Sequence, residues 1–361
     1  MQISSVEFFP CNQRQEDPTW SFALATYPVI EGWTVAISVK DGNTGLGYAQ
    51  AIPHIGASYE GVRAALEVFK PCLLGKDPLH IEAILLQMDA MLVGNGPAKA
   101  GIDGALHDLA AKLLGIPLNR LFGGPVRSSV PLIRIVPIKT PAEMAENSRK
   151  LVEQGYRYLK IKMKGDVAAD VARIAAIRDA VGPDVHLTLD PNQSYSPKAA
   201  IQALTRMESY HIDLVEQPVP THDLAGLKLV TENVAIAVEA DESAMSVGDV
   251  LNLVANRVID AVSLKVPKLG GLRNTLLAAR ICETGSIRYR VGATFGPRLH
   301  AAQALHLAAS LPRLDYACEL AEFDHLLDDP YEGLEVVNGA LMVPETVGSG
   351  VIVRQGSGLA A

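Results

Sequence analysis

Five ionisable residues in the second half of the chain recur at nearly even intervals. They are Lys162, Asp190, Glu216, Asp241 and Lys265, and successive members lie 28, 26, 25 and 24 residues apart. Each stands at the end of a short apolar run, and each interval is the length of one strand–helix unit. Strand ends of this kind converge at one mouth of a βα barrel, where active sites lie. The spacing therefore predicts that the five side chains form one site.

The three acids of this series suit a hard divalent cation. Asp190, Glu216 and Asp241 fall on consecutive predicted strands and would offer carboxylate oxygens, with positions left open for water and a ligand. Mg²⁺ prefers oxygen ligands and octahedral geometry. Neither Cys nor His stands in register with the acids, which makes zinc a poorer fit. We therefore predict one Mg²⁺ ion, with a lysine-bearing strand before the acids and another after them.

This combination could remove a proton α to a carboxylate, because a bound Mg²⁺ stabilises the enediolate that forms. A lysine is a poor base at its reference pKa of about 10.4. Burial beside a divalent cation and a second ammonium would lower that pKa and make a neutral amine accessible. Lys162 and Lys265, on opposite faces, could then deprotonate and reprotonate one carbon, or a single lysine could act per turnover. Lys160 is predicted to orient the substrate carboxylate and depress its neighbour's pKa.

Alternation within the predicted strands places the polar residues inside the barrel. Lys160 and Lys162 share one face of their strand, while the apolar residues between and beside them face the outer helices. The next strand would likewise turn His186, Thr188 and Asp190 inward. Charges inside a packed barrel are costly unless they are paired or bind a metal, so their presence there indicates a site.

The elements that position these residues form three zones along the chain. Residues 1–60 read as strands, with Asp41-Gly42 between two apolar runs as a hairpin turn. The next zone is helical, and 98–114 carries small residues along one stripe, which suits close helix packing. From Val130 to about residue 325, short apolar strands alternate with helices, which predicts a closed parallel barrel.

The predicted architecture is therefore α/β, with two domains. An α+β domain spans 1–125 and is completed by returning strands within 333–361, which would bring the two termini together. The barrel domain spans 126–332. The length of 361 residues is enough for two domains of ordinary size.

Composition excludes several classes of protein. With 32 Lys+Arg against 40 Asp+Glu and 5% aromatic residues, the chain is poorly suited to coat nucleic acid or an anionic membrane. No apolar run is long enough to span a membrane, and no export signal is read at the N-terminus. The four cysteines are scattered, so we predict reduced thiols in a cytoplasmic protein. We expect a homo-oligomer with a small-molecule carboxylate as substrate.

Short motifs around these residues resemble those of the enolase superfamily, specifically its muconate lactonizing enzyme subgroup. They are Lys160-Ile161-Lys162, Asp190-Pro191-Asn192, Glu216-Gln217-Pro218, Ala240-Asp241-Glu242-Ser243, Leu264-Lys265-Val266-Pro267-Lys268-Leu269-Gly270-Gly271, and the helix 105–117. The resemblance covers nearly the whole chain. It implies a modified (β/α)7β TIM-type barrel with an N-terminal α+β capping domain, Mg²⁺, and α-proton abstraction as the first step. Lys162 and Lys265 would be the catalytic lysines.

The sequence also departs from that subgroup. Gln50 stands where many relatives carry Glu, and 292–298 lacks an acidic residue that is frequent in relatives. Glu319-Leu320 resembles the Glu-Leu of the cycloisomerases rather than the Asp-x-Asp segment of dipeptide epimerases. This disfavours a dipeptide substrate and leaves the substrate open.

Further residues are candidates for support or for substrate contact. Asn192 and Lys268 could support the acids and lysines, and Glu319 could pair with a base lysine. Arg298 could bind a second anionic group of the substrate. Trp20 and His54 belong to the two capping-domain loops that, by the resemblance, set substrate identity.

Four hypotheses about the function stay open. An isomerase, either a racemase/epimerase or a cycloisomerase, fits the residues best, and a dehydratase or other lyase would share its first half-reaction. A Schiff-base enzyme using Lys162 or Lys265 is a third reading. A non-catalytic binding protein, in which the charges form only a structural ion-pair cluster, is the fourth.

Overall fold

The structure, a computed structural model, describes residues 1–358. Its N-terminal part is an antiparallel sheet with strand order β1-β4-β5, made by β1 (Ile3–Pro10), β4 (Gly32–Val39) and β5 (Thr44–Gln50). As the sequence predicts, β4 and β5 form a hairpin, and Gly42 adopts φ +92° in its turn. Three helices accompany this sheet: α1 (Tyr59–Leu73), α2 (Ile81–Met91) and α3 (Gly96–Leu114).

Helix α3 lies almost directly on β5 because both elements carry glycine where they meet. A Cβ added to Gly47 would lie 2.0 Å from the carbonyl oxygen of Gly101, and one added to Gly101 would lie 2.7 Å from the Cβ of Ala49. The small-residue stripe of α3 therefore produces the close packing that the sequence predicts. The helix ends at Gly115, whose φ of +67° closes the last turn.

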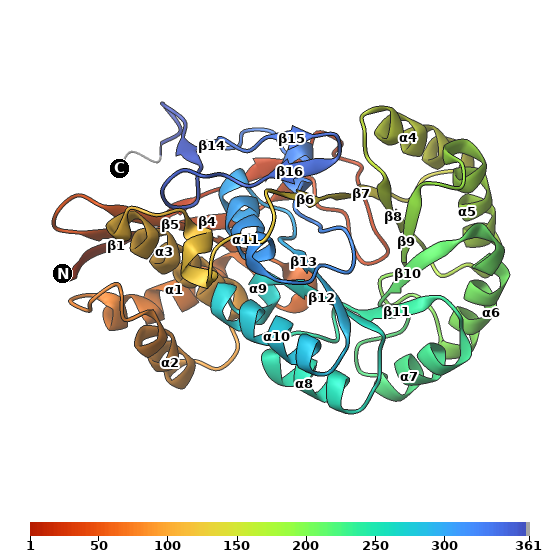
Figure 1. Cartoon of the computed structure of the whole chain (residues 1–361), viewed down its shortest axis with the longest axis horizontal. Coiled ribbons are helices and arrows are strands. Elements are labelled where there is room, and N and C mark those ends of the chain that lie inside the picture. Colours follow the sequence, from red (N-terminus) through yellow and green to blue (C-terminus); the bar gives the residue numbers. More distant parts are fainter. Residues whose placement is uncertain (359–361) are drawn as a thin grey trace.

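Seven parallel strands run in chain order around the second part of the molecule (Figure 1). They are β7 (Ile133–Val136), β8 (Tyr158–Lys162), β9 (His186–Asp190), β10 (Ile212–Glu216), β11 (Ala237–Ala240), β12 (Ala261–Lys265) and β13 (Arg288–Gly292). The eighth position is taken by Cys318 and Glu319, which form parallel bridges to Leu132 and Gly292. These bridges join the two edges of the sheet and close the ring. The expected modified (β/α)7β barrel is thereby confirmed.

The helices that connect these strands cover the outside of the ring (Figure 1). They are α4 (Pro141–Glu153), α5 (Val167–Val181), α6 (Pro197–Met207), α7 (Leu224–Asn233), α8 (Val247–Ala255), the short α9 (Val266–Leu269), α10 (Leu272–Thr284) and α11 (Arg298–Ser310). Five of them begin with a side chain that accepts a hydrogen bond from the first turn, as Thr140 does from the backbone N–H of Glu143. Local sequence thus fixes where these helices start.

The strand alternation predicted for the barrel holds at its mouth and fails at its base. Leu159, Ile161, Leu187 and Leu189 are fully buried in the core that includes residues of the outer helices. His186, expected to face the interior, is instead exposed at the first position of β9, where it stacks on Tyr158 and lies 3.2 Å from Asp213. The first residue of a barrel strand lies at the rim, where its side chain can turn to solvent.

The C-terminal segment returns toward the N-terminal part, and its last described residues lie at the same end of the molecule as the N-terminus (Figure 1). Its strands are β14 (Tyr331–Glu332), β15 (Val336–Val337), β16 (Ala340–Met342) and β17 (Ile352–Val353). They pair with one another and with β6 (Ser129–Pro131), not with the β1-β4-β5 sheet. Contact with the first domain is made instead by a bridge between Pro117 and Gly348 and a 2.9 Å hydrogen bond between Thr34 and Tyr331. Residues 359–361 of the expected C-terminal stretch lie outside the described residues.

None of the helices within residues 1–358 combines the length and the apolar character needed to cross a membrane. All four cysteines are buried free thiols.

Candidate active site

The residues predicted to form one site do meet, at the carboxyl ends of the barrel strands. Lys160, Asp190 and Glu216 have no exposed surface, and the remaining three, Lys162, Asp241 and Lys265, are at most 8% exposed. Burial of so many charges is tolerable only if they are paired, and the structure pairs all of them.

Lys160 holds the centre of the ion-pair network. Its Nζ lies 2.6 Å from Glu216 Oε2, 2.7 Å from Glu319 Oε2 and 2.9 Å from Asp190 Oδ2. Burial alone would lower the pKa of this ammonium, but the charges of Asp190 and Glu216 outweigh burial and raise the pKa well above its usual value. Lys160 therefore stays protonated, which does not suit a base. It is fully buried against the three carboxylates, so its predicted contact with the substrate carboxylate stays a prediction.

Lys162 and Lys265 stand across the ring from each other. They end β8 and β12, the second and sixth of eight strands, and so occupy opposite positions on the closed barrel. Lys162 Nζ lies 2.6 Å from Asp190 Oδ2 and 3.0 Å from Asn192 Oδ1. Each lysine is thus hydrogen-bonded to a different one of the three acids, since Lys265 pairs with Asp241.

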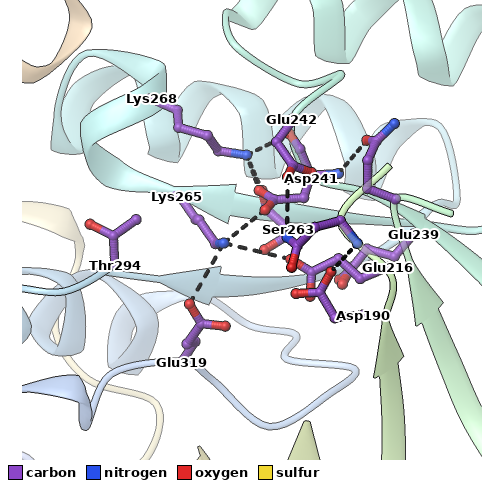
Figure 2. Close-up of polar contacts among 12 residues, drawn as sticks. Asp190, Glu216, Glu239, Asp241, Glu242, Ser263, Lys265, Lys268, Thr294 and Glu319 are labelled. Carbon is purple, nitrogen blue, oxygen red and sulfur yellow. Dashed lines mark hydrogen bonds and ion pairs between the residues drawn. The ribbon is translucent and has the colours of Figure 1, made fainter. Parts of the chain in front are cut away.

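Lys265 is surrounded by carboxylates (Figure 2). Its Nζ lies 2.8 Å from Asp241 Oδ2 and 3.6 Å from both Glu216 Oε1 and Glu319 Oε1. Burial opposes the ammonium charge, yet Asp241 and Glu319 raise the pKa of Lys265 above its usual value. This is the opposite of the lowering expected for a lysine beside a bound divalent cation, because here the carboxylates themselves face the amine. Lys268 contacts the same acid and donates to the side chain and the backbone carbonyl of Asp241.

The three acids are linked through these amines. Lys160 contacts both Asp190 and Glu216, and Lys265 contacts both Glu216 and Asp241. Within residues 1–358, no group of three or more His, Cys, Asp or Glu side chains is arranged so that it could hold a metal ion as it stands. The predicted ligands instead form an ion-pair cluster with the lysines between them.

The chemistry of this cluster nevertheless fits a divalent cation. Glu216 Oε1 is buried and accepts no hydrogen bond. Burial, and then the neighbouring charge of Asp190, raise the pKa of Glu216 to about 8. Lys160 and Arg290 both contact Oε2 of this carboxyl, so the oxygen left without a donor is Oε1. The three acids offer only the hard oxygen atoms that Mg²⁺ prefers.

The other predicted residues divide into those that join the site and one that does not. Asn192 connects Lys162 to Glu242 through its side-chain amide, and Glu319 pairs with two lysines. Arg298 does not line the pocket. Its guanidinium and its backbone N–H instead donate hydrogen bonds to Asp329, at 2.9 Å and 3.0 Å. These bonds hold the Arg298 side chain at the start of α11.

A pocket of about 840 Å³, counting the part open to solvent, lies above these residues. Lys162, Asp241, Lys265 and Lys268 line its base. Its upper wall is largely aromatic and comes from the two capping loops, through Trp20, Phe22, Tyr27 and His54, with Phe295 from the barrel side. Burial, and then the charge of Lys265, lower the pKa of His54 to about 4, so this side chain is neutral.

Sequence reasoning missed the charge pairing below the mouth. Arg290 on β13 is 1% exposed and lies between two carboxylates, 2.5 Å from Glu216 Oε2 and 2.7 Å from Glu239 Oε2. The alternation in 288–292 would have turned Arg290 inward with the other site residues. Gln217 was also missed: its Oε1 accepts from the backbone N–H of Asp241 and of Ser243, which fixes the loop after β11.

Comparisons with known proteins agree with this geometry. Residues 11–123 match the family model of the mandelate racemase / muconate lactonizing enzyme N-terminal domain, and residues 143–357 match the enolase C-terminal domain-like model. The chain belongs to the enolase superfamily, in its muconate lactonizing enzyme subgroup.

Within this superfamily the relatives include two kinds of isomerase. The hydrophobic dipeptide epimerase of Enterococcus faecalis is 37% identical over 277 residues, which is 76% of this chain and 77% of that protein. A chloromuconate cycloisomerase of Cupriavidus necator is 35% identical over 252 residues, 69% of this chain and 68% of that protein. A crystal structure of the Enterococcus faecalis dipeptide epimerase with Mg and the dipeptide L-Leu-L-Tyr superposes with a TM-score of 0.93 at 33% identity, covering 97% of this chain and 99% of that chain. The protein is thus an isomerase of this enolase-superfamily subgroup.

Proposed function

We propose that the protein transfers a proton at the carbon next to a carboxylate, with Lys162 and Lys265 as the two proton-transferring groups. The placement of these lysines on opposite strands of the closed ring carries the proposal. A substrate carbon between them can lose its proton to one amine and regain a proton from the other, which inverts its configuration. Racemase or epimerase activity follows directly.

Asp190, Glu216 and Asp241 would hold Mg²⁺ in this reaction. When bound, the ion supplies positive charge to the carboxylate oxygens of the substrate, where negative charge accumulates as the proton leaves. The proposal is supported by the buried Oε1 of Glu216, which accepts no hydrogen bond, and by the Mg in the crystal structure of the Enterococcus faecalis epimerase. Lys160, which stays protonated, fixes the acids and adds a permanent positive charge beside the reacting group.

An N-acylated α-amino acid, with dipeptides as the first class to test, is the proposed substrate. Relatives at 35–37% identity are epimerases of dipeptides, and the aromatic upper wall of the pocket suits an apolar side chain. Glu319 is already paired with Lys160 and Lys265. It is therefore committed to the lysines rather than to a substrate amino group, and the Glu319-Leu320 pair does not by itself exclude a dipeptide.

Cycloisomerisation is the second candidate. It is favoured by Glu319-Leu320, which resembles the cycloisomerases at the closing barrel strand, and by relatives such as the chloromuconate cycloisomerase of Cupriavidus necator. Cycloisomerisation in this pocket could begin with a proton transfer by one lysine acting alone. A lyase would also share this first step, so the mass of the product separates it from an isomerase by the loss of water.

The test is solvent-deuterium uptake during incubation with dipeptides, other N-acyl amino acids, muconates and hydroxy acids. We expect incorporation at the α-carbon with inversion, abolished by EDTA and restored by Mg²⁺. Turnover that persists without any divalent metal would exclude the proposed mechanism. Trapping of a carbonyl substrate by borohydride would instead identify a Schiff-base enzyme.

A further inference from the structure

The two proton-transferring lysines have different surroundings. Lys265 is enclosed by the carboxylates of Asp241, Glu216 and Glu319. Lys162 has Asp190 and Asn192 on one side, and on another the face of an aromatic ring: its Nζ lies 5.2 Å from the ring centroid of Phe22. Among the described residues, Lys265 makes no cation–π contact of this kind, so the contact with Phe22 distinguishes the two faces of the site.

The ring of Phe22 belongs to the capping domain, not to the barrel. Phe22 lies near the tip of a small hairpin closed by a bridge between Ser21 and Thr26. The hairpin is tied to the barrel side by a 2.9 Å hydrogen bond from Lys139 Nζ to Thr19 Oγ1. The position of the ring over Lys162 is therefore set by a loop that is itself attached to the barrel.

Other aromatic side chains hold the ring in place. Phe22 meets His54 edge to face at 5.3 Å between centroids, and lies 6.0 Å from both Trp20 and Tyr27. A 3.1 Å hydrogen bond between Tyr27 Oη and His54 Nδ1 joins the two capping loops beside it. Three rings from two loops thus fix the ring of Phe22 over Lys162.

We propose that Phe22 is a positioning residue for Lys162 alone. A cation within about 6 Å of an aromatic centroid is attracted to the ring face, and the attraction grows where water is excluded, as it is for this largely buried side chain. The ring directs the Lys162 ammonium into the pocket and keeps it at the position from which it exchanges a proton with substrate. Phe22 therefore controls proton exchange on one of the two faces of the substrate carbon.

This inference rests on the proposed function, and the test separates the two. Each enantiomer, or α-epimer, of an active substrate is incubated in deuterated solvent, and deuterium is measured in the recovered starting isomer. Lys162→Ala and Lys265→Ala assign each isomer to its lysine. For Phe22→Leu, which keeps apolar bulk and removes the ring, we expect exchange on the Lys162 face to slow by about tenfold, the size of a partly desolvated cation–π contact. Exchange on the Lys265 face should stay within about twofold of the wild type.

Two controls belong with this variant. Phe22→Tyr restores a ring face and should recover the Lys162-face exchange. Leu24→Ala alters an exposed side chain of the same hairpin that does not line the pocket, and it should leave both faces unchanged. Equal slowing on both faces by Phe22→Leu, or no slowing on either, would overturn the inference. Absence of exchange in the wild type with every carboxylate would instead reject the proposed function.

A readout without turnover keeps the inference testable in that case. In protein labelled with ¹³C-lysine, the ring current of Phe22 should shift the ε-methylene resonances of Lys162 upfield, and Lys162→Ala identifies them. The shift should vanish in Phe22→Leu and persist in Phe22→Tyr. Resonances that do not move in Phe22→Leu would show that the ring does not lie over Lys162.

Discussion

Lysine and carboxylate side chains at the barrel mouth depend on one another, because all of them are buried at least nine-tenths and water cannot fully hydrate their charges. Lys160 alone contacts Asp190, Glu216 and Glu319. Removing one member therefore leaves its partners buried and uncompensated. A substitution at this site can therefore act in two ways: it can remove a group that transfers a proton, or it can leave a buried charge without its partner.

Replacement of either proton-transferring lysine should abolish inversion without loss of metal binding. In Lys162→Ala or Lys265→Ala, one face lacks its acid–base group, and we expect racemisation to fall by at least about a thousandfold, within the range for general acid–base groups. Mg²⁺ binding, followed by titration calorimetry, should persist because the three acids remain. Lys164→Ala, which alters an exposed side chain two residues beyond Lys162, is the matched control. Full activity in either variant would exclude that lysine.

Arg290 should be needed for stability rather than for proton transfer. It pairs with Glu216 and Glu239 below the mouth, so Arg290→Met leaves the buried Glu239 without its ion-pair partner and removes one of the two cations that contact Glu216 Oε2. We expect the free energy of unfolding to fall by about 3–5 kcal/mol, as for other broken buried pairs. Urea denaturation measures this. Arg313→Ala, which breaks an exposed pair with Asp315, should cost less than about 1 kcal/mol. Similar losses in the two variants would contradict this account.

At the scale of elements, the contact between α3 and β5 decides where the capping domain sits over the barrel. The helix also touches the barrel directly: Asp103 accepts from the backbone N–H of Leu272 at the start of α10, and Gln303 of α11 donates to the carbonyl of Gly104 at 3.1 Å. The same helix thus packs on the capping sheet and docks on the barrel.

Gly47→Ala should weaken this contact. The added Cβ would lie 2.0 Å from the Gly101 carbonyl oxygen and 2.6 Å from the Ala105 nitrogen, both rigid backbone atoms. We expect destabilisation of about 1–3 kcal/mol, as for other overpacked sites, measured by thermal unfolding. Gly248→Ala is the control, because its Cβ meets nothing closer than 3.6 Å within α8. It should be neutral or stabilising by up to about 1 kcal/mol, and a larger loss there than at Gly47 would refute the packing argument.

The whole barrel, with the evenly spaced charged residues at its strand ends, could be predicted from sequence because each strand–helix unit repeats the same pattern. Lys160, Asp190 and Glu216 are visible as polar residues in register at apolar strand ends. The partners that decide their ionisation are less visible: Arg290 follows the same alternation but was not singled out. Phe22 acts on Lys162 from 140 residues away in a loop without periodicity. Arg298 has a distant acidic partner, Asp329, which local sequence could not indicate.

Metal binding should stabilise the molecule as a whole, since the acids that would hold the ion stand at or just after the ends of three different barrel strands. A ligand that binds only the folded state adds about 2.7 kcal/mol at a hundredfold excess over its Kd. Mg²⁺ should therefore raise the midpoint of thermal unfolding relative to EDTA. Asp190→Asn should remove most of this increase. An unchanged midpoint in the wild type would argue against Mg²⁺ at this site.

The unequal environments of Lys162 and Lys265 carry a thermodynamic consequence. If the substrate has a single stereocentre, its two mirror forms have equal energy, so kcat/KM must be the same in both directions whatever flanks each amine. The different surroundings of the two lysines can then appear only as differences in kcat between the two directions that are matched by equal differences in KM, so that the ratio stays the same. For substrates with a second stereocentre that equality is lifted, and the two directions are free to differ.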